Sequence, residues 1–437
     1  MSGLKKRVSR IAALSAVTAA LLVNSGGCAD GGKGYVYYLN YNPEADSALH
    51  GIAEHYTELT GVPVKIITAA SGSYPSTLSA QMNKPSPPTL FVCGDVRDIA
   101  DWEYYCYDLG RTELSGMIGN TEQCLYDREG KMRAVGYCYE AFGIIVNKRL
   151  LAKAGYEVGD IRSFASLKAV AEDIHSRSGE LGFDAFTSSG LDDSSSWRFS
   201  AHLANIPLYY EFRDDNITEQ PASITGRYLG LYKNVWDMYI NNATVPKDSI
   251  PDATGNMAEE EFGSGKAVFY QNGTWEYEKL TGSAGYSMDP GDLTMIPIYC
   301  GMEGEENAGL CVGTENYWAV NSQAGQKNID ATIDFMCWLV SSDEGRQMMS
   351  EQFGVTPFKG HTEPENVFFG AAKQYEDEKR YDITWEFGST PNSTQWRAGV
   401  VSALTKYSCG GGDWSDVERA FAEGWSYQYR IENCIFD

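Results

Sequence analysis

Histidine and positive charge are scarce in this sequence. Only 5 of its 437 residues are histidine, and 35 lysines and arginines stand against 59 aspartates and glutamates. No H-E-x-x-H, G-x-S-x-G or C-x-x-C motif occurs, and no cysteine and histidine cluster has zinc spacing. These absences argue against zinc-hydrolase, serine-hydrolase and thiol-redox chemistry, so the sequence implies no metal and no cofactor.

The charge balance also argues against polyanionic partners. Four of the 35 basic residues lie in residues 1–27, so the rest of the chain carries 31 basic against 59 acidic side chains, a formal charge of −28. Such a field repels phosphate backbones and anionic lipid surfaces. We therefore expect no nucleic-acid partner, and an anionic ligand is disfavoured unless a local basic pocket overrides the field.

No apolar run is long enough to span a bilayer as a helix. Residues 11–23 carry no charge but number only thirteen, and they follow a basic head and precede small residues and Cys28. This layout predicts an export signal over residues 1–27. A cysteine after small residues resembles a bacterial lipoprotein signal, which implies a lipidated Cys28 with residues 28–34 as a tether. Simple secretion is the alternative.

The other nine cysteines leave their redox state open. Export permits disulfides, and three pairs are close in sequence: Cys106/Cys124, Cys300/Cys311 and Cys409/Cys434. Burial of the cysteines as small apolar residues is an equal alternative.

Strands alternate with helices along the remaining part of about 410 residues. Residues 35–39 predict a strand. A helix with one apolar face follows, and Gly61 ends it. Strands are expected at 62–68 and 89–93, and further along at 142–146 and 267–270. This order predicts βαβ units in an α/β fold, long enough for two domains.

Trp275 stands just past the end of the strand over residues 267–270, beside Gly273. Ligands of open α/β sheets bind outside the carboxyl ends of the strands. Trp275 therefore faces a ligand or, in the alternative, fills the core. In the first case Gly273 would let the ligand approach the backbone closely.

Four local segments, in this order, resemble extracellular solute-binding proteins of ATP-driven sugar importers, the group that includes maltose-binding protein. They are residues 139–148 (YEAFGIIVNK), 262–269 (FGSGKAVF), 272–275 (NGTW) and 334–345 (DFMCWLVSSDEG). The resemblance implies a two-lobed periplasmic-binding-protein-like fold of type II. Each lobe would be a mainly parallel sheet flanked by helices, and three segments would cross between them. The first lobe would be residues 35–136 plus 294–340, and the second 140–290 plus 341–437.

The resemblance also implies a function. The chain would be a monomer, lipid-anchored on the outer face of a bacterial cell membrane, that closes on a mono- or oligosaccharide and delivers it to the permease subunits of an ABC transporter. It would not be an enzyme. A surface glycan-binding adhesin or sensor is one alternative. A secreted glycoside hydrolase is another, but 59 acidic residues will always contain some pair of carboxylates, so that signal is empty.

Aromatic rings cover the C–H faces of a sugar, and three tryptophans are candidates for this role. The resemblance places Trp275 and Trp396 at the ligand, whereas the alternative for Trp396 is packing on Val400. Trp197 lies in a serine-rich loop and would otherwise anchor that loop to the surface.

Carboxylates and amides match sugar hydroxyls. Asp95 ends a predicted strand and would otherwise cap the next helix, and Glu140 follows a crossing segment and would otherwise form a hinge salt bridge. The other candidates follow predicted strands or lie in a polar loop: Asn42, Glu44, Ser73, Tyr74, Glu315 and Asn316. For Ser73 and Tyr74 a plain turn is an equal alternative.

Overall fold

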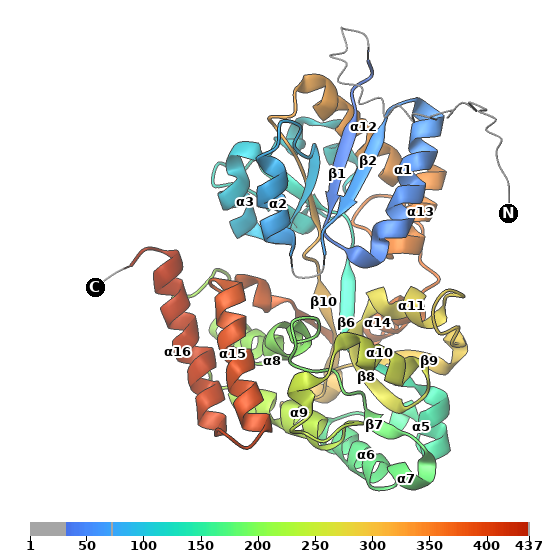
Figure 1. The fold of residues 1–437 in the computed structure, drawn as a ribbon, viewed down its shortest axis with the longest axis vertical. Coiled ribbons are helices and arrows are strands. Elements are labelled where there is room, and N and C mark those ends of the chain that lie inside the picture. Colours follow the sequence, from blue (N-terminus) through green and yellow to red (C-terminus); the bar gives the residue numbers. More distant parts are fainter. Residues whose placement is uncertain (1–31, 71–72, 436–437) are drawn as a thin grey trace, which may run out of the picture.

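The computed structural model describes residues 32–70 and 73–435 and places them in two lobes, each built on its own sheet (Figure 1). The predicted signal and the acceptor Cys28 lie outside the described residues, and those predictions stay untested. The first sheet has the strand order β2-β1-β3-β11-β5-β4, and the second β12-β10-β6-β8-β7 with β9 paired to β6. The strands of the first sheet are β1 Val36–Asn40, β2 Val64–Thr68, β3 Leu90–Cys93, β4 Cys124–Tyr126, β5 Met132–Gly136 and β11 Tyr317–Val320.

Helices cover the first sheet because each buries one apolar face. The helix α1 Asp46–Thr60 buries Leu49, Ile52, Ala53 and Tyr56, which recur at helical spacing, and ends at Gly61 with φ 72°. The prediction of this helix and its stop is confirmed. The other helices of this lobe are α2 Tyr74–Met82, α3 Val96–Trp102, α4 Glu113–Met117, α12 Gln326–Ser341 and α13 Asp343–Phe353.

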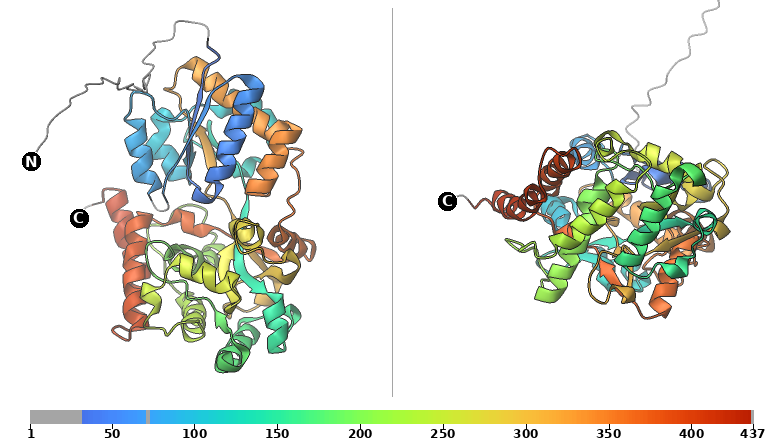
Figure 2. Two further views of the ribbon diagram at one scale, coloured as in Figure 1. Left: turned by 45° about the vertical axis from the view of Figure 1, so that its right-hand side comes forward. Right: turned by 90° about the horizontal axis from the view of Figure 1, so that it is seen from below.

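The second lobe is larger, and its central strand β6 Glu140–Asn147 is buried after its first residue. Its other strands are β7 Asp184–Phe186, β8 Ala267–Gly273, β9 Leu293–Ile296, β10 Ala308–Gly313 and β12 Tyr381–Thr384. Its helices are α5 Lys148–Ala154, α6 Phe164–Ser176, α7 Ser178–Leu181, α8 Ala204–Asp215, α9 Leu229–Asn241, α10 Gly255–Gly263, α11 Tyr277–Thr281, α14 Val367–Asp377, α15 Ser393–Ser408 and α16 Trp414–Glu432. The last two lie side by side at one edge of the lobe (Figure 2).

The chain crosses between the lobes three times, as expected. It crosses from β5 to β6, from β10 to β11, and from α13 to α14 (Figure 1). The crossing segments are hydrogen-bonded to one another: the Tyr137 amide donates to the Asn316 carbonyl at 3.0 Å, and the Tyr139 amide to the Val355 carbonyl at 2.8 Å. These bonds satisfy backbone groups where no sheet can do so.

The α/β two-lobed fold is confirmed, but two details of it are wrong. The sheets are mixed rather than mainly parallel, because β11, β10 and β9 run antiparallel to their neighbours β3 and β6. The boundaries also shift. Residues 293–313 carry β9 and β10 of the second sheet, whereas α13 and Phe358 pack in the core of the first lobe. Both segments flank crossings, where apolar periodicity does not reveal to which sheet a strand is hydrogen-bonded.

All nine cysteines among the described residues are free, so none of the three candidate pairs is a disulfide. Seven of the nine are buried, in agreement with the alternative of small apolar residues. Within residues 32–70 and 73–435, no helix combines the length and apolar character needed to cross a membrane.

The pairing of β9 with β6 leaves no room for a side chain at Gly143. A Cβ there would lie 2.5 Å from the Ile296 carbonyl oxygen and 3.1 Å from Met295 Cγ. We expect Gly143→Ala to lower the free energy of unfolding by about 1–3 kcal/mol, since backbone must move. Denaturant titration measures this. Gly51→Ala, in α1 with no heavy atom within 4 Å of the new Cβ, is the control and should not destabilise.

Candidate functional site

Three half-buried tryptophans of the second lobe gather where its strands end. Trp275 lies in the short 3-10 helix η8 Thr274–Glu276, directly after β8, and Trp385 directly follows β12. Trp197 precedes the π-helix η6 Arg198–Leu203. The Trp197 and Trp275 ring centroids are 6.1 Å apart, and Trp385 joins them through His202, whose ring lies 5.6 Å from Trp275 and 6.3 Å from Trp385.

Two glycines seat two of these rings. A Cβ on Gly273 would lie 2.2 Å from the six-membered ring of Trp275, and one on Gly313 would lie 2.6 Å from Trp385 Cγ. Both glycines pair with β6, where Gly273 is opposite Phe142 and Gly313 is opposite Glu140. The expectation that Gly273 makes room for a ligand is therefore wrong. The Trp275 ring fills the space beside Gly273, so a ligand could contact only the outer side of this ring.

His202 forms the floor below the tryptophans. Its ring stacks on Phe142 at 3.8 Å with an interplanar angle of 4°. Burial lowers the pKa of His202 well below its ordinary value, and Arg198 and Arg397 add to the effect. The imidazole is therefore neutral at physiological pH, and the floor is an apolar stack rather than a cation.

Carboxyl groups of both lobes converge on the same space. Burial, followed by repulsion from Glu315 and Glu44, raises the pKa of Glu140 to about 8. Burial raises the pKa of Glu276, beside Trp275, to about 7, and Glu44 contributes there as well. Glu44 of the first lobe thus acts electrostatically on two carboxyls of the second lobe across the junction.

Tyr41 and Arg397 complete the polar set. Glu315 is the largest cause of a raised pKa of Tyr41. Burial also raises the pKa of Glu315, and Arg397 of α15 opposes the rise. A first-lobe phenol and a second-lobe guanidinium thus both act on the same carboxyl. The set can accept and donate hydrogen bonds, because Glu140 and Glu276 are partly protonated near neutral pH.

Two of the predicted residues are hinge groups. Asn316 is 3% exposed, and its Nδ2 donates to Glu140 Oε2 at 2.9 Å while its Oδ1 accepts from the Tyr137 hydroxyl at 3.1 Å. Glu140 is thus held by an amide rather than by the hinge salt bridge of the alternative.

Trp396 is buried in the core of the second lobe. It is 1% exposed, its Nε1 donates to the Phe421 carbonyl at 2.9 Å, and its ring packs edge-to-face on Phe421 at 4.6 Å. The alternative, a core residue in the same cluster as Val400, is correct. Its position one residue before Arg397 on α15 turns it toward α16.

Tyr74 is also a core residue, since it is 7% exposed and its hydroxyl accepts from the Val92 amide at 2.6 Å. Its neighbour Tyr41, 40% exposed and 5.4 Å away edge-to-face, reaches the junction instead. Ser73 donates to the Ala70 carbonyl at 2.7 Å in the turn before α2.

Asp95 and Asn42 act mainly as caps. Asp95 Oδ1 accepts from the Arg97 and Asp98 amides at 2.7 and 3.2 Å, which confirms the alternative of a helix N-cap. Asn42 Oδ1 accepts from the Glu44 amide at 3.1 Å and caps the 3-10 helix η1 Pro43–Ala45. The Glu44 side chain itself remains exposed.

Sequence reasoning missed six residues of this site: Tyr41, Phe142, His202, Glu276, Trp385 and Arg397. The strand-end rule that selected Trp275 also applies to Tyr41, after β1, and to Trp385, after β12. The strand β12 is hard to predict because only four residues form it. Only one of the four, Ile383, is fully buried, so the strand shows no apolar alternation.

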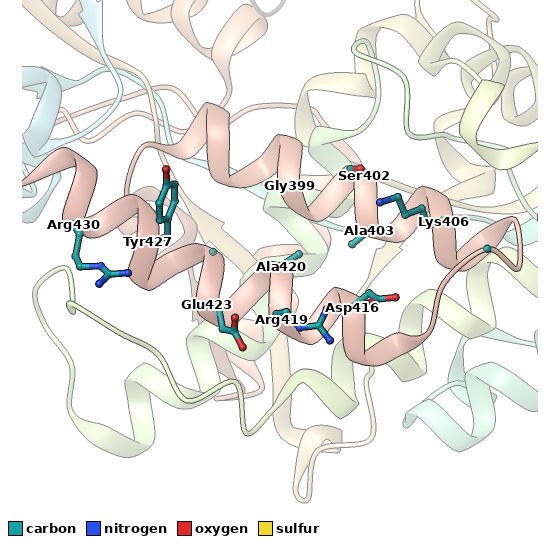
Figure 3. A pocket seen from close by; sticks show the side chains of 12 residues that line it. Gly399, Ser402, Ala403, Lys406, Asp416, Arg419, Ala420, Glu423, Tyr427 and Arg430 are labelled. Carbon is teal, nitrogen blue, oxygen red and sulfur yellow. Dashed lines mark hydrogen bonds and ion pairs between the residues drawn. The ribbon is translucent and has the colours of Figure 1, made fainter. Parts of the chain in front are cut away.

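A large groove lies elsewhere, between α15 and α16 on the outer side of the second lobe. It holds about 770 Å³ and is lined by small residues such as Gly399 and Ala420, with charged side chains of both signs around them (Figure 3). None of the predicted site residues lines it. We place the candidate site at the junction, because the strand ends, tryptophans and perturbed carboxyls meet there. Among the described residues, no group of histidine, cysteine, aspartate and glutamate could hold a metal ion.

Comparison with known proteins identifies the family. The model of the family described as bacterial extracellular solute-binding protein matches residues 51–406. The chain belongs to this family. Among curated proteins, none matches this extracellular solute-binding protein in sequence.

Several solved structures share its fold. RafE in complex with raffinose has a TM-score of 0.68 at 15% identity, covering 90% of this chain and 99% of that one. The GacH receptor of Streptomyces glaucescens has a TM-score of 0.64 at 21% identity, covering 92% and 99%. A sugar transporter protein of Bacillus licheniformis in complex with stachyose has a TM-score of 0.65 at 16% identity, covering 90% and 100%.

The raised pKa of Glu140 predicts a pH dependence of stability. The folded pKa of about 8 exceeds the ordinary 4.5, so the folded protein holds a proton that the unfolded chain releases between those values. The free energy of unfolding therefore falls as the pH rises from about 5 to 8. We expect Glu140→Gln to reduce this fall by ~2 kcal/mol, less than the full shift because solvent reaches the carboxyl.

Denaturant titration at pH 5 and pH 8.5 measures the difference between parent and variant. The exposed Glu58 of α1 provides the control, since Glu58→Gln should leave the fall unchanged. Equal slopes in the parent and Glu140→Gln would show that Glu140 ionises normally.

Proposed function

We propose that this solute-binding protein captures an uncharged carbohydrate between its lobes and delivers it to the permease of an ABC transporter. The observation that carries the proposal is the meeting of three half-buried tryptophans with the partly protonated carboxyls of Glu140 and Glu276, at a junction where the first-lobe Glu44 acts on both carboxyls. Flat rings match the C–H faces of a sugar, and carboxyls and amides match its hydroxyls.

The solved relatives give independent support for a saccharide. The ones described above include complexes with raffinose, acarbose and stachyose, and a further structure of this fold is a chitin oligosaccharide binding protein. A solute-binding protein from Agrobacterium radiobacter is in complex with ribitol, which is also rich in hydroxyls and uncharged. We infer the same broad class here, a mono- or oligosaccharide.

Contact with both lobes would couple binding to closure. A ligand shifts the equilibrium between open and closed forms only if it favours one of them. A sugar stacked on Trp275 and Trp385 and hydrogen-bonded to Glu44 or Tyr41 would join the second lobe to the first. The ligand would thus stabilise the closed form, which is the form presented to the permease.

Tryptophan fluorescence tests the binding site. Titration with a panel of mono- and oligosaccharides should give a micromolar-range response, on the order of −8 kcal/mol. We expect Trp275→Ala and Trp385→Ala each to weaken binding by about tenfold or more, because each removes a stacking ring. Trp338→Ala serves as control, since that half-buried ring packs on Tyr56 and Phe335 in the first lobe.

All variants are first checked for cooperative thermal unfolding. If both site variants bind like the parent and like Trp338→Ala, the tryptophan cluster is not the binding site. If no saccharide produces a response, the ligand class is wrong.

Two alternatives predict different results. A glycoside hydrolase needs one protonated and one ionised carboxyl, and the raised pKa of Glu140 beside Glu315 is the observation that favours it. A hydrolase would convert an oligosaccharide to shorter products, whereas a receptor releases it unchanged. A glycan-binding adhesin or sensor would bind equally well but would not stimulate ATP hydrolysis by a permease complex.

The proposed lipid anchor is tested separately at Cys28. Expressed with its own leader in a bacterial host, the parent should sediment with membranes and incorporate labelled palmitate. We expect Cys28→Ser to lose the label and pass to the soluble fraction, because no thiol remains for acylation. Cys409→Ser, which changes an exposed free cysteine, is the control and should remain in the membrane fraction.

A soluble parent without label would favour simple secretion. That result would leave the sugar site untouched, since the predicted anchor and the junction are separate parts of the chain.

A further inference from the structure

Arg97 is a first-lobe side chain that donates hydrogen bonds to the second lobe. It lies in the first turn of α3, and its Nη1 donates to the Thr390 carbonyl while its Nη2 donates to the Gly388 carbonyl. Glu432 Oε1, at the end of α16, lies 3.8 Å from Nη1. Within the described part of the chain, Arg97 thus joins α3 of the first lobe to the C-terminal part of the second lobe.

Asp95 prepares Arg97 for this contact. One carboxylate oxygen of Asp95 caps α3, and the other accepts from Arg97 Nε at 3.2 Å. The guanidinium is therefore held in place within the first lobe, so little side-chain entropy is lost when it meets the second.

The accepting side is equally well ordered. Glu432 Oε2 accepts from the Asn392 amide at 3.1 Å, and Gln220 Nε2 donates to the Ser389 carbonyl at 3.1 Å. Asn205 Oδ1 accepts from the Glu386 amide at 2.7 Å. Side chains of three other segments therefore hold the loop that presents its carbonyls to Arg97.

The same loop carries a ring of the candidate site. Trp385 immediately precedes the 3-10 helix η11 Glu386–Ser389, which includes Gly388, and Thr390 follows. A rigid loop that docks on α3 through Gly388 and Thr390 must bring Trp385 into a fixed position relative to the first lobe.

We infer that Arg97 is a positioning residue that latches the Trp385 loop to the first lobe and so sets how long the protein stays closed on its ligand. The inference rests on the proposed function for its ligand, but not for the latch itself. Loss of the latch should favour the open form, which lowers the fraction of protein competent to bind and speeds ligand release.

Small-angle X-ray scattering without ligand tests the latch directly. A compact chain of this length has a radius of gyration of roughly 22 Å. We expect a larger radius for Arg97→Ala than for the parent, and a smaller increase for Arg97→Lys, which keeps the charge but cannot reach two carbonyls with a fork. The control is Arg111→Ala, since Arg111 is 84% exposed on the same lobe and pairs only with Asp108 among the described residues.

Stopped-flow fluorescence with the best saccharide of the panel tests the consequence. The dissociation rate of Arg97→Ala should rise about tenfold, as expected for the loss of charge-assisted hydrogen bonds, with a much smaller change in the association rate. If Arg97 only stabilised the fold, Arg97→Ala would lower the melting temperature but leave the ratio of the dissociation rate to the association rate unchanged.

Equal radii for the parent and Arg97→Ala overturn the latch. A larger radius with an unchanged dissociation rate overturns its role in ligand retention. If the parent binds no saccharide, the proposed function fails, and the ligand-free scattering still decides whether Arg97 holds the lobes together.

Discussion

The hydrogen bonds between the crossing segments are the constraint on which the arrangement of the molecule depends. Three stretches of chain leave one sheet and enter another, and between the sheets their backbone groups have no regular partners. Tyr137, Asn316 and Val355 supply those partners, and Asn316 also fixes Glu140. The position of the Glu140 side chain, at the start of the central strand of the second lobe, is thus fixed by a hydrogen bond from the hinge. A change of hinge angle would move Glu140 relative to the first-lobe groups Glu44 and Tyr41.

Burial makes ionised carboxyls at the junction energetically unfavourable. Burial, with repulsion from neighbouring carboxylates such as Glu44, raises the pKa of Glu140 and Glu276 into the physiological range, so each group is either a partly protonated acid or a poorly solvated anion. Hydroxyl groups relieve this cost because they donate to an ionised carboxyl and accept from a protonated one. The electrostatics therefore suit an uncharged, hydroxyl-rich ligand, and they disfavour an anion in agreement with the charge of the whole chain.

Sequence patterns identified the fold and part of the site, for definite physical reasons. Helical spacing of apolar residues located α1, and the rule that ligands meet strand ends selected Trp275. The rule does not say whether an aromatic side chain near a strand end points outward or into the core. Tyr41 and Tyr74 both lie near strand ends and touch each other, but only Tyr41 reaches the junction. Nor did the rule distinguish Trp396, which faces α16, from Trp385, which follows a strand too short to recognise. The boundaries of the lobes failed because pairing of β9 and β10 with β6 depends on long-range hydrogen bonds.

The two exposed thiols give the chain a built-in pair of reporters. Cys434 lies two residues beyond Glu432, the α16 carboxylate next to Arg97, whereas Cys409 lies at the opposite end of the α15–α16 pair. Both are free and the other seven described cysteines are buried, so a thiol-reactive dye would attach to these two sites without any engineered cysteine. A dye at Cys434 would sense lobe movement, and one at Cys409 would give the background signal.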